Sequence, residues 1–244
     1  VGSDALANNT TGFQNTAVGK SSLAAHTTGA SNIGIGYQAG TSITTGSNNV
    51  CLGTDSGVYT TALTTGGQNT LLGHAAYTTA ADADHAIVIG FAVGGADGYT
   101  TLGETTNEIR TAHGSTSWAT VSDERYKKDI VASTAGLSFV NALQPRTFKY
   151  KTLGELPTSF NAYEADSTKV FKNSNTNHGF IAQEVKAVID ADSSIKDGFR
   201  LWDDREDGSQ EVAEAALIPI LVKAIQELSA KNDALLARIE TLEG

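Results

Sequence analysis

Cysteine, positive charge and long apolar runs are scarce in this sequence, and each shortage excludes a class of protein. One cysteine in 244 residues cannot form a disulfide within the chain or build a cysteine-based zinc site. The count of 17 Lys and Arg against 27 Asp and Glu gives a net charge of −10, which disfavours a nucleic-acid partner. No run reaches about 18 apolar residues, so membrane insertion is not expected.

The scarcity of charge is confined to the first half of the chain. Residues 1–121 hold two basic residues, Lys20 and Arg110, and seven acidic ones, whereas residues 122–244 hold 15 basic and 20 acidic residues. The glycine content shows the opposite contrast, with 19 glycines in the first half and 6 in the second. This contrast indicates two architectures. The start at Val1-Gly2 has neither a basic nor an apolar leader and predicts a piece of a longer protein.

The first half repeats a short motif in which an asparagine is followed by apolar residues and a glycine. The copies are Asn15-Thr-Ala-Val-Gly19, Asn32-Ile-Gly-Ile-Gly36, Asn49-Val-Cys-Leu-Gly53, Asn69-Thr-Leu-Leu-Gly73 and the weaker Ala86-Ile-Val-Ile-Gly90. Their glycines are spaced by 17, 17, 20 and 17 residues. A fixed period of this length predicts a solenoid.

Within each copy, apolar residues alternate as in a short strand, for example Ile33 and Ile35. Glycine and asparagine tolerate the positive φ of tight turns. One such strand cannot bury its apolar face, but rungs stacked at about 4.8 Å could. A disordered linker would not keep aliphatic residues at fixed offsets. Cys51 is expected to be a small buried hydrophobe, and the four histidines of this half share no ligand spacing, so no metal or cofactor is expected.

These repeats resemble the parallel β-roll heads of trimeric autotransporter adhesins, and similar repeats occur in phage tail-fibre shafts. The resemblance covers about residues 1–103 and implies a trimeric fibre stem. Residues 104–121 would then be a junction, which includes Trp118.

The end of the chain, about residues 215–243, predicts a coiled-coil helix. Spacings of 3 and 4 residues place isoleucine at a and leucine at d, with one polar seam residue, in the series Ile218, Leu221, Ile225, Leu228, Asn232, Leu235, Ile239 and Leu242. Pro219 is expected in the first turn or at a kink. The alternative is a single amphipathic helix packed on its own domain. Isoleucine at a with leucine at d favours dimers, whereas a fibre stem favours trimers.

The second half contains four sequence segments whose order along the chain matches that of a known family. They are Ser122-Asp-Glu-Arg-Tyr-Lys-Lys-Asp-Ile130, Leu143-Gln-Pro-Arg-Thr-Phe-Lys-Tyr150, His178-Gly-Phe-Ile-Ala-Gln-Glu-Val185 and Leu217-Ile-Pro-Ile-Leu-Val-Lys-Ala-Ile-Gln-Glu-Leu228. Together they resemble the C-terminal intramolecular chaperone domain of phage endosialidases and other tail spikes, which also occurs in the eukaryotic myelin regulatory factor. The resemblance spans about residues 122–244.

This resemblance implies that the domain assembles the upstream fibre into a trimer and then cleaves itself off between Val121 and Ser122. It places the nucleophile at Ser122 and its basic partner at Lys127. Asp123, His178 and Gln183 are candidates for supporting roles. The chain departs from many members at 211–216, where it has no tyrosine.

The chemistry of the two residues is consistent with that role. A serine hydroxyl needs a base, and a lysine serves when burial or a neighbouring cation such as Lys128 leaves it neutral. Ser122 could then attack the carbonyl of Val121, giving an ester that water hydrolyses; the sequence does not name the oxyanion donor. In a regular helix or strand, two residues five positions apart do not bring their side chains together. A turn or another subunit must therefore bring Ser122 to Lys127. On local sequence alone, Ser122 is also a good helix N-cap.

The expected fold class is mixed, with parallel β-roll repeats followed by an α+β chaperone domain that ends in a long coiled-coil helix. The expected function is a self-cleaving assembly chaperone on a trimeric virion tail fibre. The alternative is a non-cleaving trimerisation tip of a fibre or bacterial surface adhesin. Expected partners are two further copies, upstream fibre segments and a host-surface receptor or glycan. A glycan-cleaving enzyme has little support, because the repeats show no pair of catalytic carboxylates.

Overall fold

The structure is a computed structural model that describes residues 2–192, 195 and 201–243. The chain divides into two units, residues 1–128 and residues 129–244. The predicted divisions after residues 103 and 121 stay predictions.

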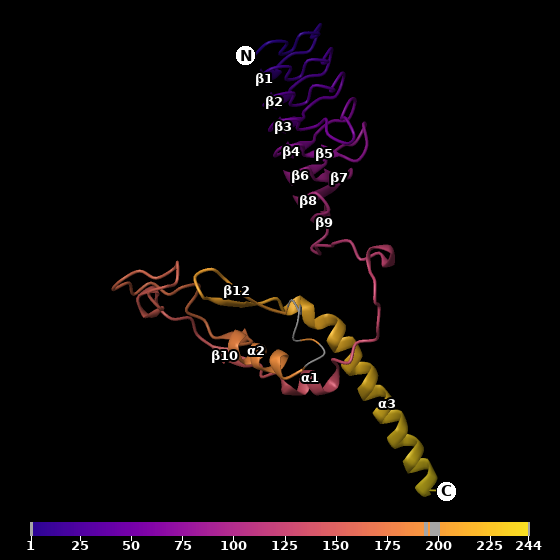
Figure 1. Ribbon diagram of the computed structural model, residues 1–244, viewed down its shortest axis with the longest axis vertical. Coiled ribbons are helices and arrows are strands. Elements are labelled where there is room, and N and C mark those ends of the chain that lie inside the picture. The colour runs from indigo at the N-terminus through magenta and orange to yellow at the C-terminus, as the bar shows by residue number, and fades with distance from the viewer. Residues whose placement is uncertain (1, 193–194, 196–200, 244) are drawn as a thin grey trace. The chain divides into compact units, whose positions relative to one another are not determined.

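The first unit is a parallel β-solenoid, as the 17-residue period predicts (Figure 1). Its main sheet contains, in spatial order, β1 (Thr16–Val18), β2 (Ile33–Ile35), β3 (Val50–Leu52), β4 (Thr70–Leu72), β6 (Ile87–Phe91), β8 (Tyr99–Glu104) and β9 (Asn107–Ala112). The first six strands pair in parallel and β9 returns antiparallel to β8. A second, two-stranded parallel sheet joins β5 (Tyr77–Thr78) to β7 (Gly94–Gly95).

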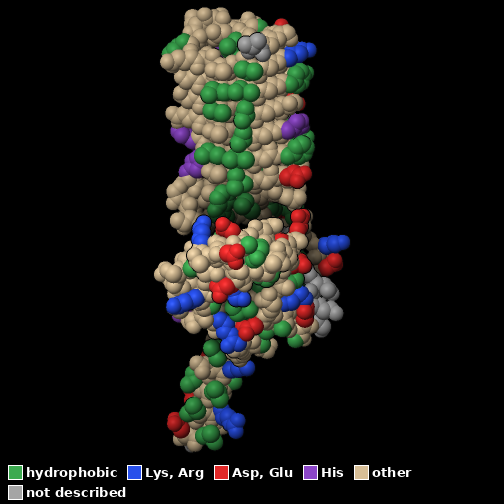
Figure 2. Space-filling view, turned by 90° about the vertical axis from the view of Figure 1, so that its left-hand side faces the viewer, with side chains coloured by type: hydrophobic (Ala, Val, Ile, Leu, Met, Phe, Trp, Pro, Cys, Tyr) green, Lys and Arg blue, Asp and Glu red, His purple; other side chains and the backbone are tan. Residues whose placement is uncertain are grey.

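The direction of the strand side chains differs from the simplest expectation. In β2 the middle residue, Gly34, is buried, whereas Ile33 and Ile35 each keep 37% of their surface exposed. The same pattern recurs along the stack, and the third residues of the strands form an exposed apolar column: Val18, Ile35, Leu52, Leu72 and Ile89. Figure 2 shows apolar side chains gathered along the repeats. Stacking within one chain therefore leaves the alternating aliphatic residues uncovered.

The interior of the solenoid is filled by the middle strand residues and by residues of the turns. The largest buried apolar cluster consists of Leu23, Ala39, Ile43, Cys51, Leu63, Leu71, Ala76, Ala86, Val88 and Val93. Burial raises the pKa of the Cys51 thiol to about 12, while a hydrogen bond with Ser56 acts in the opposite direction. Cys51 is thus a buried hydrophobe, as expected.

The repeat asparagines form a buried ladder instead of occupying turns with positive φ. The Asn32 Oδ1 atom accepts hydrogen bonds from the backbone N–H of Asn49 at 3.0 Å and from its Nδ2 at 3.1 Å. The Asn49 Nδ2 also donates to the Gly66 carbonyl at 2.9 Å. Equivalent bonds link Asn15 to Asn32 and Asn49 to Asn69. The positive φ lies one residue earlier, as at Asn48.

The glycine that closes each strand is required by the stacking distance. Gly36 has φ +132°, and a Cβ there would lie 2.6 Å from the carbonyl oxygen of Gly53 on the next rung. Gly53 and Gly73 repeat this relationship one rung further. Any larger residue would push two rungs apart, which explains the regular spacing of glycine in the sequence.

The second unit is a small α+β domain. Its elements in order are α1 (Leu137–Ala142), β10 (Arg146–Phe148), η2 (Leu153–Glu155), β11 (Asn177–Gly179), α2 (Ala182–Ala191), β12 (Trp202–Asp204), β13 (Gln210–Val212), η3 (Glu214–Leu217) and α3 (Ile218–Glu243). The antiparallel pairs are β10 with β11 and β12 with β13. The core joins α1, α2 and the start of α3 through Ala135, Phe139, Leu143, Val185, Ile189, Leu201, Leu217 and Ile220.

Two of the sequence blocks are joined by an ion pair. Arg146, on β10, donates two hydrogen bonds to the Glu184 carboxylate on α2, at 3.0 and 2.8 Å. At the other end of the core, the Glu227 carboxylate of α3 accepts a hydrogen bond from the backbone N–H of Leu137, at 2.9 Å. The long helix is therefore fixed to α1 through a polar contact as well as through the core.

Helix α3 presents two different faces. Leu217, Ile220 and Ala224 pack into the domain. The predicted a/d seam lies elsewhere: Ile225 is 66% exposed, and Leu228 is also exposed. Packing of the seam on its own domain, the alternative considered from the sequence, is thus not what the structure has. Pro219 lies in the first turn, where its missing N–H costs no helical hydrogen bond.

The mixed fold class expected from the sequence is confirmed, with a parallel β-solenoid, an α+β domain and a long C-terminal helix. A search of the described helices finds none with the length and apolar character needed to cross a membrane.

Candidate functional site

The segment that contains Val121 and Ser122 follows the last strand of the solenoid. Ala119 forms an isolated antiparallel bridge with Arg110 of β9, and the two backbone N–H groups donate to the opposite carbonyls at 2.8 Å. After this bridge, Val121 and Ser122 are exposed and lie outside any helix or strand. A peptide bond in an exposed segment outside helices and strands is accessible to attack by a neighbouring side chain.

A short turn follows and reverses the chain. Residues Glu124–Tyr126 form the 3-10 turn η1, and Lys127 caps its C-terminal end through a backbone N–H bond to the Glu124 carbonyl at 2.9 Å. The Lys127 Nζ atom lies 2.8 Å from the Ser122 Oγ atom and donates a hydrogen bond to it. The turn that the five-residue spacing requires is present, and it joins the two predicted catalytic side chains within one chain.

Asp123 stabilises this turn. Its Oδ1 atom accepts hydrogen bonds from the Arg125 backbone N–H and from Arg125 Nε, each at 2.9 Å, and its Oδ2 atom lies 2.7 Å from Arg125 Nη2. The Arg125 hydrogen bonds, with a smaller contribution from the charge of Lys127, hold the pKa of the Asp123 carboxyl below its usual range. Asp123, not Ser122, is thus the N-cap of the turn, and the Ser122 hydroxyl is left to bond with Lys127.

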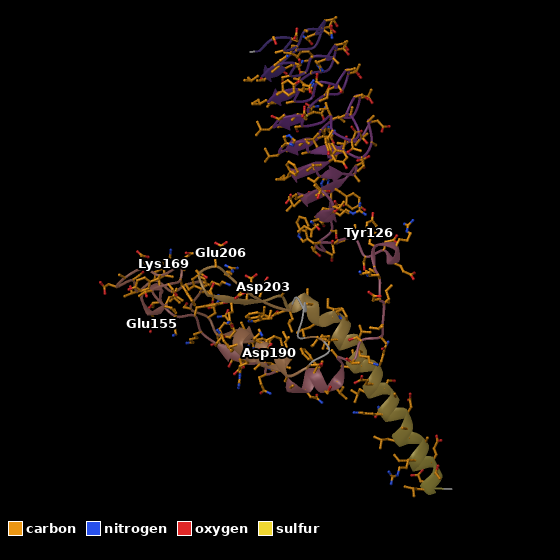
Figure 3. The ribbon with its side chains drawn as sticks, in the orientation of Figure 1. Tyr126, Glu155, Lys169, Asp190, Asp203 and Glu206 are labelled. Atoms are coloured by element: carbon orange, nitrogen blue, oxygen red, sulfur yellow. The ribbon has the colours of Figure 1, made fainter. Side chains whose placement is uncertain are left out.

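The surroundings of the pair are open in the single chain. Ser122, Lys127 and Lys128 are all exposed, and so is the aromatic ring of Tyr126, which is labelled in Figure 3. A lysine acts as a base only when its amine is neutral, and burial is the usual way to favour that form. The geometry of a serine–lysine pair is therefore present without the enclosure that base catalysis needs.

The other two candidates lie in the second unit. His178 is on β11, paired with Thr147 of β10, and its exposed side chain lines a surface pocket of about 350 Å³ together with Arg146 and Glu214. Gln183 is exposed in the first turn of α2. The block that contains both residues also supplies Val185 to the core, as expected from the sequence. The roles of His178 and Gln183 stay predictions.

The part of the chain that the structure describes contains no cluster of three or more His, Cys, Asp or Glu side chains able to hold a metal ion. Sequence reasoning did not foresee the Asp123–Arg125 ion pair. An acidic residue two positions before an arginine, at the start of a polar segment, is the only signal that could have indicated it.

Comparison with known families gives a specific match. Residues 122–193 match the family described as chaperone of endosialidase, a family of self-cleaving peptidases. The match begins at Ser122, the first residue of the predicted domain. No curated protein and no solved structure matches the chain. The match over residues 122–193 supports the prediction of an intramolecular chaperone domain, and the family suggests a trimeric phage tail protein.

Proposed function

We propose that this chain is the C-terminal part of a trimeric phage tail fibre or spike whose chaperone domain drives trimer folding and then releases itself by cleavage between Val121 and Ser122. The contact of 2.8 Å between Lys127 Nζ and Ser122 Oγ, at the first residue of the chaperone match, carries the proposal. The same proposal places the protein on the virion, where the fibre would meet a host-surface receptor or glycan.

The reaction requires one internal acyl transfer and one hydrolysis. The neutral Lys127 amine accepts the Ser122 hydroxyl proton while Oγ attacks the carbonyl carbon of Val121. The C–N bond breaks, the Ser122 nitrogen takes a proton, and an ester joins Val121 to the Ser122 oxygen. Water then cleaves the ester and leaves a carboxylate on Val121 and free amino and hydroxyl groups on Ser122.

Assembly supplies the enclosure that the single chain lacks. A second copy packed over the exposed η1 turn would bury Lys127 and favour its neutral form. Exposed apolar side chains at Val121 and Tyr126 offer a surface for such packing. Cleavage would then follow correct assembly, because an unassembled chain keeps its lysine in water.

Two exposed apolar surfaces support assembly from copies of the same chain. One is the outward column of the solenoid, which includes Ile35 and Leu72. The other is the seam of α3, where Val222 and Leu236, at e positions, widen the a/d stripe beyond what a two-stranded coiled coil covers. A wider stripe favours three helices over two.

Removal of the chaperone has a physical advantage for a fibre. Pairing three β-solenoids in register is slow because the contacts are non-local, and a coiled coil at the chain end aligns the copies first. Once the aligning domain is gone, an unfolded stem cannot readily refold or exchange copies. The fibre is then held by a high barrier to unfolding as well as by its equilibrium stability.

A second candidate is a trimerisation tip that does not cleave, on a fibre or a bacterial surface adhesin. The exposure of both Ser122 and Lys127 favours it, since a solvated lysine is a poor base. The two candidates share the fold and the trimer and differ only in the chemistry at residue 122.

Intact mass measured on the expressed chain separates these candidates, with Ser122→Ala as the matched control. Two fragments, one ending at Val121 and one beginning at Ser122, that are absent in the control support the self-cleaving chaperone. A single full-length mass from a folded trimer in both samples would contradict cleavage and leave the trimerisation tip.

A further inference from the structure

The chain between β10 and β11 extends as a two-stranded arm whose base is rich in lysine. The Phe171 N–H donates to the Lys151 carbonyl at 3.0 Å, and the Leu153 N–H donates to the Lys169 carbonyl at 2.8 Å, with an isolated bridge between Thr152 and Val170. These bonds make residues 151–153 and 169–171 an antiparallel pair.

Four exposed lysines lie on this pair or next to it: Lys149, Lys151, Lys169 and Lys172. Alternation within the pair puts Lys151 and Lys169 on the side of Phe171, which is 43% exposed. The Lys172 ammonium lies over the Tyr150 ring, 5.3 Å from its centroid. Among the described residues, none of the four lysines lies within 4.0 Å of a carboxylate. We call these four lysines and Phe171 the lysine patch.

The hairpin of β12 and β13 carries the opposite charge. Asp203 and Glu211 are direct cross-strand partners, and such like-charged pairs are destabilising. Arg205 forms an ion pair with Glu211. The exposed carboxylates of Asp203, Asp204 and Glu206 have no ion pair among the described residues; we call these three the acidic hairpin tip. Figure 3 labels Lys169 on the arm and Asp203 and Glu206 on the hairpin.

We infer that the lysine patch of one copy docks on the acidic hairpin tip of the neighbouring copy in the trimer. A ring with threefold symmetry needs two different, complementary surfaces on each copy, because each contact joins one patch to another in a head-to-tail manner. The second unit presents such a pair: among the described residues, the lysines on one element and the carboxylates on the other form no ion pair within 4.0 Å. This inference rests on the proposed trimer and adds the contact that orients neighbouring copies around the threefold axis.

The charges also suit the task of an assembly domain. Complementary patches steer the encounter of copies and fix their register more than they raise final affinity. The contact would form before the apolar seams of α3 and the exposed apolar columns of the solenoids pack against those of the other copies. Its loss should therefore lower the yield of correct trimers more than the stability of trimers already formed.

Charge reversal in chains that also carry Ser122→Ala, so that every copy stays full length, tests the inference. One variant changes Lys149, Lys151 and Lys169 to Glu, and the other changes Asp203, Asp204 and Glu206 to Lys. Each is refolded from denaturant at limiting concentration, and trimers are counted by native mass spectrometry. We expect each variant alone to give about fivefold fewer trimers than the Ser122→Ala parent at low salt.

Mixing the two variants distinguishes a contact between copies from one within a chain. In a mixed ring, two of the three contacts join opposite charges and one still joins like charges, so the trimer yield should rise well above that of either variant alone. If the patches instead pair within one chain, each variant chain stays mismatched, and recovery only when all six changes are combined in one chain would overturn the inference. Parent yields from both variants would overturn it as well, whereas a monomeric parent would contradict the proposed trimer itself.

Discussion

Lys127 Nζ donates a 2.8 Å hydrogen bond to Ser122 Oγ across a single 3-10 turn, so one chain holds both members of the proposed dyad. The turn is closed by the Asp123–Arg125 ion pair and not by Ser122 itself. This division of roles leaves the serine hydroxyl available for reaction.

Replacing Lys127 by Arg should stop cleavage as completely as replacing it by Ala. A guanidinium keeps its positive charge but cannot become a neutral base. We expect the cleavage rate to fall by about 100-fold or more in both variants, measured by the appearance of the two fragment masses. Lys128→Ala, which removes a neighbouring cation but keeps the base, should slow cleavage less than either change at Lys127. Full-rate cleavage in Lys127→Arg would contradict base catalysis by this residue.

Ile225→Asp should abolish the trimer without unfolding the second unit, because Ile225 lies on the exposed seam of α3. Ile220→Asp is the matched control: Ile220 is buried in the domain core, so this change should unfold the domain. Circular dichroism and sedimentation velocity separate the two outcomes. If assembly encloses Lys127, the monomeric Ile225→Asp chain should also cleave slowly, and cleavage at the parent rate would refute that dependence.

Asn49→Ala should destabilise the solenoid by about 3 kcal/mol. The change removes the Asn49 Oδ1 acceptor of the Asn69 N–H and Nδ2 groups and leaves the Gly66 carbonyl without its donor. The Asn32 Oδ1 atom loses the Nδ2 donor and keeps the backbone N–H of residue 49. Denaturant unfolding of the solenoid measures the loss. Asn8→Ala, at an exposed position with one side-chain hydrogen bond to a carbonyl, should cost less than about 1 kcal/mol.

His26→Leu should stabilise the solenoid by about 1 kcal/mol. His26 is fully buried and its Nδ1 atom has no hydrogen-bond partner. Ile43 and Leu63 occupy the equivalent interior positions of the next two rungs, so a leucine suits the site. The Gly29 carbonyl keeps its hydrogen bond from Asn15 Nδ2 after the change. The reverse change, Ile43→His, should lower the unfolding free energy, and a stabilised Ile43→His would contradict the argument.

Acid should loosen the hairpin of the chaperone domain through Asp207. Hydrogen bonds from the Ser209 hydroxyl, the Asn161 N–H and the Ser209 N–H lower the pKa of its carboxyl to about 2. Since an unfolded aspartate titrates near pH 4, the resulting stabilisation is complete above that value and is lost as the pH falls towards 2. Trp202 fluorescence in a Trp118→Phe chain reports the change. Asp207→Asn should remove this acid step, and an unchanged step would assign it to another group.

The order of the elements was predictable because it depends on patterns local to the chain. The 17-residue glycine period required a stack of rungs, and the alternating spacing of 3 and 4 residues required a helix with an apolar seam. The Ser122–Lys127 pair was also accessible from sequence, through the resemblance of its block. The Asn32–Asn49 ladder was not, because asparagine suits both a turn and a buried amide, and only the neighbouring rung decides between them.

The sequence by itself thus determined the repeat, the long helix and the candidate dyad. The tertiary structure decided which side each apolar residue faces: Gly34 inward and Ile35 outward in the solenoid, and Ile220 inward and Ile225 outward on α3. Alternation specifies two faces but does not label them, since either set of residues could pack inside. The neighbouring residues decide between the two faces. At residue 34 a Cβ would lie 2.5 Å from Ser22 Oγ and 2.9 Å from Leu23 Cγ, so glycine fits the inward position, and on the long helix α1 covers one side.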